Sequence, residues 1–148
     1  MAGFFSRLFG GISQNEIEAR LIPIMAIAGA DGTISQEEQA MLRMHFERLG
    51  ISGERAMEIL GNATVPILPT KEEHRIEVLL TAAGMMMCDG RVTPTEYKLF
   101  LTLARCMGFP QVCVDAAIEN AVELANGLHP GVNIRAQLAA AARANVHA

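Results

Sequence analysis

The chain carries one eight-residue stretch twice, and this duplication constrains the fold more than any other feature. The first copy reads Asp31-Gly32-Thr33-Ile34-Ser35-Gln36-Glu37-Glu38, and the second reads Asp89-Gly90-Arg91-Val92-Thr93-Pro94-Thr95-Glu96. Both have the pattern Asp-Gly-x-(Ile/Val)-(Ser/Thr)-x-x-Glu, and matched residues stand 58 positions apart. Such a repeat predicts two similar units that pack on each other, because neither unit alone can bury its apolar face.

Each copy is typical of a chain that ends one helix and begins the next. Glycine readily adopts the left-handed conformation that closes many helices, so Gly32 and Gly90 are expected at helix ends. Ser35 and Thr93 each precede a glutamate by three residues, which is the spacing of a capping box at a helix start. The same spacing recurs at Ser13-Gln14-Asn15-Glu16 and at Thr70-Lys71-Glu72-Glu73.

Apolar residues recur with a helical period along most of the chain, which predicts an all-α protein of about seven helices. The composition agrees, because 51% of the residues are hydrophobic but only 5% are aromatic, a balance that favours packed helices over a β-sandwich. We expect an aromatic N-terminal arm over residues 1–11 and a single helical domain over residues 12–148. Within this domain, two three-helix repeats related by a pseudo-twofold axis precede one further helix; the three segments are 13–62, 70–126 and 130–146.

Some residues in these segments carry expectations of their own. Pro23 lies inside the first helical pattern and should kink or split that helix, because proline removes a hydrogen bond. Ile34 and Val92 are expected to plug the base of the core beside the two loops. His45 lies on an apolar stripe and is matched by Leu103 in the second copy, so we expect a hydrogen-bonded core histidine.

The sulfur-containing residues are interpreted as structural. The run Met85-Met86-Met87 is typical of adaptable core packing. The three cysteines, Cys88, Cys106 and Cys113, lack the spacing of a zinc site or a disulfide framework, so reduced and mostly buried thiols are expected. With no secretory signal pattern at the N-terminus, the sequence predicts a cytoplasmic protein.

Charge and motifs argue against several classes of function. The formal net charge is −4, with 12 basic and 16 acidic residues, whereas nucleic-acid binding needs clustered Lys and Arg. The sequence lacks a nucleophile elbow, a phosphate-binding loop and a dinucleotide fingerprint. We therefore expect neither a nucleic-acid partner nor an enzyme, and we assign no catalytic residues.

The repeated stretch resembles the second half of an EF-hand calcium loop, in which aspartate and glycine precede a distant glutamate. The first and third positions of that loop would be Ile27 and Gly29, which offer no carboxylate, so a complete EF-hand is not expected. In one interpretation the two loops are purely structural. In the other they bind a divalent cation or a basic partner through Asp31, Glu38, Asp89 and Glu96, with Glu37 as a further candidate.

The aromatic arm has two interpretations as well. It groups Phe4, Phe5, Leu8 and Phe9 within a few residues of the N-terminus. The arm either packs on the domain or serves as an anchor that touches a partner groove or the inner face of a membrane. A segment this short binds a membrane only weakly by itself, and no apolar run reaches the ~20 residues of a transmembrane helix.

Two segments of the chain resemble the TerB-like tellurite-resistance family. One runs from Ala28-Gly29-Ala30 through the first Asp-Gly stretch to Leu49-Gly50-Ile51, and the other runs from Cys88 through the second stretch to Met107-Gly108-Phe109. The resemblance extends over about residues 17–125. It implies a compact all-helical fold of about seven helices, with an acidic surface near the paired motifs.

The resemblance also implies a function in tellurite or other stress responses, without catalytic activity, beside membrane-associated or metal-sensing partners. A related domain occurs in membrane-anchored J-domain co-chaperones. Only Asp31, Glu38, Asp89 and Glu96 are carried over as site residues, and Thr95 stands where the first copy has Glu37. Two hypotheses follow: a stress-response protein that binds a divalent cation through its paired loops, or a helical adaptor that recruits a protein partner.

Overall fold

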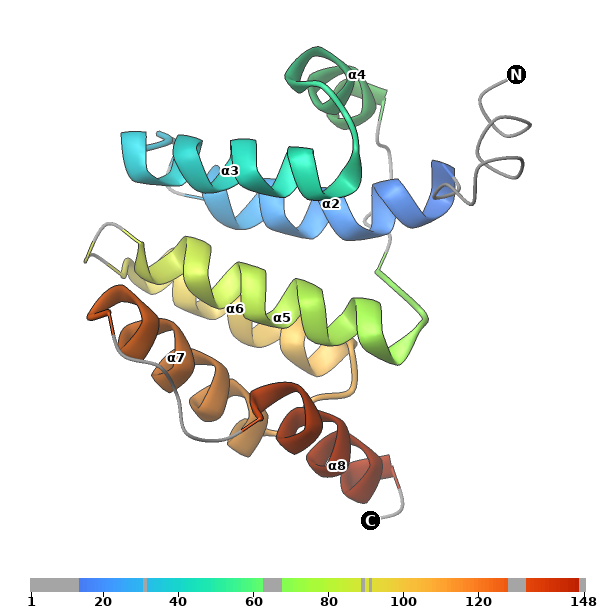
Figure 1. Cartoon of the computed structure of the whole chain (residues 1–148), viewed down its shortest axis with the longest axis vertical. Coiled ribbons are helices and arrows are strands. Elements are labelled where there is room, and N and C mark those ends of the chain that lie inside the picture. Colours follow the sequence, from blue (N-terminus) through green and yellow to red (C-terminus); the bar gives the residue numbers. More distant parts are fainter. Residues whose placement is uncertain are drawn as a thin grey trace.

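The computed structural model describes residues 14–30, 32–62, 68–88, 90, 92–127 and 133–146, and over these ranges the protein is all helical with no strand. The predicted all-α class and the expected seven helices are therefore confirmed for the described part of the chain (Figure 1). The helices are α2 (Gln14–Ala28), α3 (Gln36–Leu49), α4 (Gly53–Asn62), α5 (Glu72–Met87), α6 (Pro94–Cys106), α7 (Gln111–Ala125) and α8 (Ile134–Val146).

Helix α5 lies at the centre of the fold and contacts α2, α3, α6, α7 and α8. Figure 1 shows α2 and α3 on one side of α5, and α7 and α8 on the other. Nine of the sixteen residues of α5 are buried, so the helix has no broad solvent face. Met85 and Met86 are among them, which confirms the predicted core packing of two of the three consecutive methionines.

The two capping boxes predicted within the repeated stretches, at Ser35 and at Thr93, are both present. At the start of α3, the Ser35 hydroxyl accepts from the Glu38 amide at 3.1 Å, and the Glu38 carboxylate accepts from the Ser35 amide at 3.0 Å. At the start of α6, the Thr93 hydroxyl and the Glu96 carboxylate make the equivalent bonds at 3.1 and 3.3 Å. Serine or threonine with a glutamate three residues later therefore specified both helix starts.

The glycines of the two stretches have the backbone that the sequence predicts. Gly32 and Gly90 have φ values of 86° and 75°, in the left-handed region that side chains with a Cβ rarely adopt. Their amides donate to the carbonyls of Gly29 and Met87 at 3.0 and 3.2 Å. Each bond reverses the chain after a helix, so that the next helix can begin within a few residues.

The expectation for Ile34 and Val92 is wrong. Both side chains are exposed instead of plugging the core. Among the described residues of the two stretches, the buried ones are Glu38 and Glu96, whose carboxylates fold back and accept hydrogen bonds at the helix starts.

Two predicted helix starts are displaced. Helix α5 begins after Lys71, which has an extended backbone and no side-chain cap, so the capping box expected at Thr70 does not form. The Lys71 ammonium instead lies 3.3 Å from a Glu16 oxygen of α2. Helix α8 begins at Ile134, and the Asn133 side chain accepts a hydrogen bond from an amide of the first turn of α8 at 3.2 Å; residue 130, the predicted start, lies outside the described residues.

The other local expectations have mixed outcomes. Helix α2 runs continuously through Pro23, which is fully buried, so the helix is not split there. All three cysteines are free, and Cys113 is buried as expected, but Cys106 is exposed at the end of α6. None of the described helices is long and apolar enough to span a bilayer. The aromatic arm with Phe4, Phe5, Leu8 and Phe9, and the capping box at Ser13, lie outside the described residues.

Candidate functional site

The four residues predicted to hold a cation divide into two groups. Glu38 and Glu96 are each 4% exposed, and each carboxylate accepts the cap hydrogen bonds of its own helix. Glu96 also accepts from the Thr93 hydroxyl at 3.0 Å. Asp31 and Asp89 lie outside the described residues. The structure thus assigns Glu38 and Glu96 a structural role as caps.

The part of the chain that the structure describes contains no group of three or more His, Cys, Asp and Glu side chains placed to hold a metal ion. Glu37, the further candidate, is exposed in the first turn of α3. A cation site built from described residues alone is therefore not present. Whether the loops bind a cation depends on Asp31 and Asp89 and stays a prediction.

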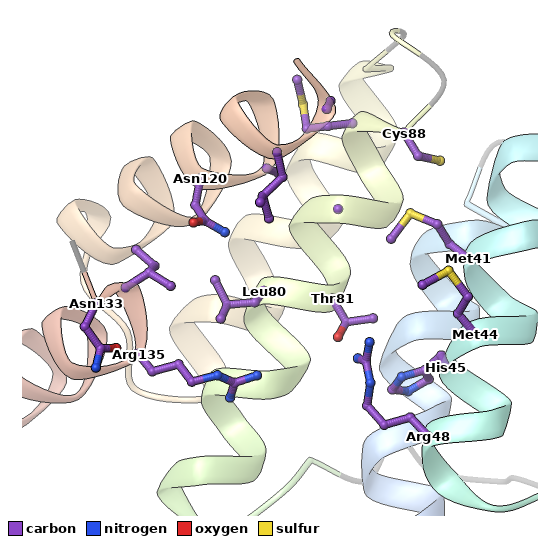
Figure 2. A pocket seen from close by; sticks show the side chains of 16 residues that line it. Met41, Met44, His45, Arg48, Leu80, Thr81, Cys88, Asn120, Asn133 and Arg135 are labelled. Carbon is purple, nitrogen blue, oxygen red and sulfur yellow. The ribbon is translucent and has the colours of Figure 1, made fainter. Parts of the chain in front are cut away.

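A different candidate site lies further along the chain of α3. An open groove of about 890 Å³ is lined by residues of α3, α5, α7 and α8 and of the segment just before α8. Figure 2 shows α3 as one wall, α5 as the floor, and α7 with α8 as the opposite wall. We name it the α5 groove. Neither Glu38 nor Glu96 lines it.

The lining of the α5 groove is apolar and basic. Three methionines contribute to it, Met41 and Met44 from α3 and Met87 from α5. Among the sixteen described residues that line it, only Arg48 from α3 and Arg135 from α8 are charged, and none is acidic. In a chain with more acidic than basic residues, this is a local reversal of charge.

The apolar surface continues beyond the hollow itself. Met44 on one wall is 60% exposed, and Leu124 on the other wall is 54% exposed. Both are large apolar side chains at the rim of the α5 groove. Exposed apolar residues that gather around a concave surface often mark an interaction site, whereas single scattered ones do not.

A buried ion pair joins α2 and α5. The Arg20 guanidinium donates two hydrogen bonds to the Glu77 carboxylate, at 2.6 and 2.7 Å, and both side chains are 10% exposed. Burial by itself would raise the pKa of Glu77, but the hydrogen bonds and charge of Arg20 outweigh it and hold that pKa below its ordinary value. The pair therefore stays ionised and joins the two helices.

His45 connects this ion pair to the α5 groove. Its Nε2 lies 2.8 Å from the Arg20 carbonyl oxygen, which only accepts, so Nε2 carries the proton and donates. Nδ1 is buried and has no partner among the described atoms. His45 is fully buried, and the predicted hydrogen-bonded core histidine is confirmed. One edge of its ring nevertheless lines the α5 groove (Figure 2).

The protonation of His45 follows from its surroundings. Burial lowers the pKa of His45 below its ordinary value, and the charges of Arg48 and Arg20 lower it further. The hydrogen bond to the Arg20 carbonyl and the charge of Glu77 act in the opposite direction without reversing the shift. His45 is consequently neutral in the folded protein near neutral pH.

A pH dependence of stability follows from this shift. On acidification from about pH 7.5 to about pH 5.5, the unfolded chain takes up a proton at His45 before the folded protein does, so the melting temperature should fall. Glu77 contributes to the pH dependence of stability only at lower pH. Its pKa is depressed, so the stability that its charge provides is lost only as the pH falls through and below the ordinary titration range of a glutamate. Melting curves of the wild type and of His45→Gln, which retains a donor toward Arg20, test the assignment. An equal fall in both proteins would contradict it.

The sequence analysis missed the α5 groove. Arg48, Arg135 and Leu124 belong to three different helices, and no local pattern connects them. Arg20 and Glu77 were also missed, although a signal exists. Each is a charged residue flanked by apolar residues on both sides inside an apolar helix, and the two charges are opposite.

Comparisons of this chain with known protein families, with curated protein sequences and with solved structures find no match in any of the three. The α5 groove and the two Asp-Gly loops are therefore the features from which a function has to be argued.

Proposed function

We propose that this protein is a non-enzymatic helical adaptor that recruits a partner protein through the α5 groove, in the setting of a stress response. One observation carries the proposal: an open groove lined by four helices has an apolar and basic lining, exposed methionine and leucine at its rims, and no acidic residue among the described residues that line it. Methionine is flexible and polarisable, and it is common on surfaces that bind partner helices.

The TerB-like family remains part of this proposal. Besides the all-helical fold, residues at matched positions have matching surroundings: Leu42 and Phe100 are both buried, and so are Leu49 and Met107. The proposal extends to two three-helix repeats related by a pseudo-twofold axis. The link to tellurite and other stress responses rests on the sequence resemblance alone.

Site-specific photocrosslinking in cells tests the adaptor function. A photoreactive amino acid at Met44, in the α5 groove, is compared with the same substitution at Met57 on α4. The two methionines are 60% and 59% exposed, but Met57 does not line the groove, so the comparison separates location from exposure. We expect one defined partner, identified by mass spectrometry, at Met44 and not at Met57. The same adducts at both positions, or none at Met44, would refute the proposal.

A second candidate function is divalent-cation binding by the two Asp-Gly loops. The observation in its favour is that Asp31 and Asp89 both directly precede a left-handed glycine, at matched positions of the two stretches. The helix caps require Ser35, Thr93 and the glutamates, but they do not require these aspartates.

Metal titration tests this second candidate. Calcium, magnesium, manganese and zinc are added separately while the melting temperature and the amide NMR shifts are followed. Saturable shifts confined to the two loops, lost in the double variant Asp31→Asn/Asp89→Asn and retained in Asp115→Asn, would support cation binding. Unchanged spectra at millimolar concentrations of all four metals would exclude it.

A further inference from the structure

We propose that the partner presents an acidic amphipathic helix, whose apolar face lies in the α5 groove while its carboxylates pair with Arg48 and Arg135. This inference rests on the adaptor function proposed above and states the chemistry of the partner. It makes the two arginines the residues that select the partner, and the methionines the residues that accommodate it.

The charges of the α5 groove argue for an anionic occupant. Neither Arg48 nor Arg135 forms an ion pair or a side-chain hydrogen bond with another described residue. By contrast, Arg20, Arg55 and Arg143 each pair with a glutamate. Two unpaired guanidinium groups on opposite walls of a groove without carboxylates leave an excess of positive charge, and a guanidinium binds carboxylates in a bidentate manner.

The shape of the site argues for a helix over a compact small molecule. A ligand enclosed between the walls would leave Met44 and Leu124 exposed at the rims, whereas a helix lying along the groove would cover both. The walls belong to α3 on one side and to α7 with α8 on the other, and α5 forms the floor (Figure 2). A groove formed by helices on either side of a recessed third helix is a common binding site for the apolar face of a partner helix.

The α5 groove also has a polarity along its length. Figure 2 shows Arg48 and Arg135 at one end, both directed toward α5 beside Leu80 and Thr81, whereas Cys88 lies at the other end. The partner helix should therefore carry its carboxylates near one end of its apolar stripe. Its C-terminal end is the better candidate, because the negative end of the helix dipole would then also lie between the arginines.

The test uses a fluorescein-labelled alanine-based peptide of about 18 residues, five helical turns long. Leucines occupy one face of the peptide, and glutamates occupy the last turn of that face; a control peptide has lysines in place of the glutamates. Fluorescence anisotropy measures binding of both peptides to the full chain. The tested variant is Arg48→Glu/Arg135→Glu, and the control variant is Arg43→Glu/Arg105→Glu, which makes the same change in net charge outside the groove.

We expect the acidic peptide to bind the wild type and the control variant with similar affinity, and to bind the groove variant at least about tenfold more weakly. The lysine peptide should bind the groove variant better than it binds the wild type, because the charges are then reversed on both sides. Binding that falls equally in both variants, or acidic-peptide binding too weak to measure in the wild type, would overturn the inference. Arg48 and Arg135 are exposed, so thermal melting should show that both variants fold.

Three further outcomes have a defined meaning. If decanoate binds with the same dependence on Arg48 and Arg135 while the acidic peptide does not bind, the occupant is a small anionic amphiphile and the inference is wrong. If photocrosslinking at Met44 captures a defined partner but the peptide fails, the adaptor function stands and only the chemistry assigned to its partner is wrong. If Met44 captures no partner while the peptide binds with the expected dependence on the arginines, the adaptor function fails and the chemistry assigned to the groove stands.

Discussion

Replacement of Glu77 by glutamine is expected to lower the free energy of unfolding by about 3 kcal/mol, because it leaves the buried Arg20 guanidinium without a charged partner. Both side chains are 10% exposed, and two hydrogen bonds of 2.6 and 2.7 Å join them. Glutamine has nearly the same shape as glutamate, so the loss measures the charge and not a cavity. Chemical denaturation monitored by circular dichroism measures the change.

The exposed pair between Arg143 and Glu72 provides a matched control. It also has two hydrogen bonds, at 2.8 and 3.2 Å, but the Arg143 side chain is 68% exposed. The same substitution, Glu72→Gln, should therefore cost well under about 1 kcal/mol, because water screens the pair. If Glu77→Gln costs no more than Glu72→Gln, the Arg20–Glu77 pair does not hold α2 and α5 together.

A double variant separates the loss of a partner from the value of the pair. Arg20→Met/Glu77→Met removes both charges and replaces them with apolar side chains of similar length. Breaking a buried pair is costly mainly because one charge remains unpaired, so the double variant should be more stable than Glu77→Gln. His45 should keep its hydrogen bond in this variant, since it binds the Arg20 backbone carbonyl and not the side chain.

Local chemistry explains which features could be predicted from the sequence. The capping boxes at Ser35 and Thr93 each depend on four consecutive residues, and both formed as predicted. Thr70 has the same spacing, yet Lys71 became the N-cap residue. A spacing therefore permits a cap, but the position of the whole helix decides whether the cap forms. For Ile34, hydrophobicity alone was misleading, because the side chain is exposed while the charged Glu38 of the same stretch is buried in its cap.

The α5 groove could not be predicted because it depends on how distant helices pack. Arg48 and Arg135 lie far apart in sequence, and each alone looks like an ordinary exposed arginine on a helix surface. Only the packing of α3 and α8 against α5 brings them to the same groove. The cation hypothesis, by contrast, was based on residues that lie close together in sequence, within one repeated stretch. The fold uses Glu38 and Glu96 of that repeat as caps.

Truncation of Leu138 to alanine is expected to release α8 from the rest of the fold. Leu138 is completely buried, with 0% of its surface accessible to solvent. It is the only buried residue among the described side chains of α8. Leucine-to-alanine changes in a core cost about 3 kcal/mol. Because the other apolar residues of α8 that pack on the core, Ile134, Ala139, Ala141 and Ala142, are only partly buried, the loss should favour local undocking of α8 over global unfolding.

The buried thiol of Cys113 reports this undocking. Cys113 lies in α7 with its sulfur 3.9 Å from the Leu138 carbonyl oxygen, and burial raises the pKa of the thiol, so a docked α8 keeps it unreactive. In a Cys88→Ser/Cys106→Ser background, Leu138→Ala should increase the labelling rate of Cys113 by about a hundredfold, the factor that corresponds to ~3 kcal/mol. Leu124→Ala removes the same atoms from an exposed position of α7 and should leave Cys113 protected. Equal labelling rates in the two variants would show that Leu138 does not anchor α8.

Because α8 carries Arg135, release of α8 should also remove one of the two arginines from the α5 groove. Leu138→Ala should therefore bind the acidic peptide more weakly than the wild type does.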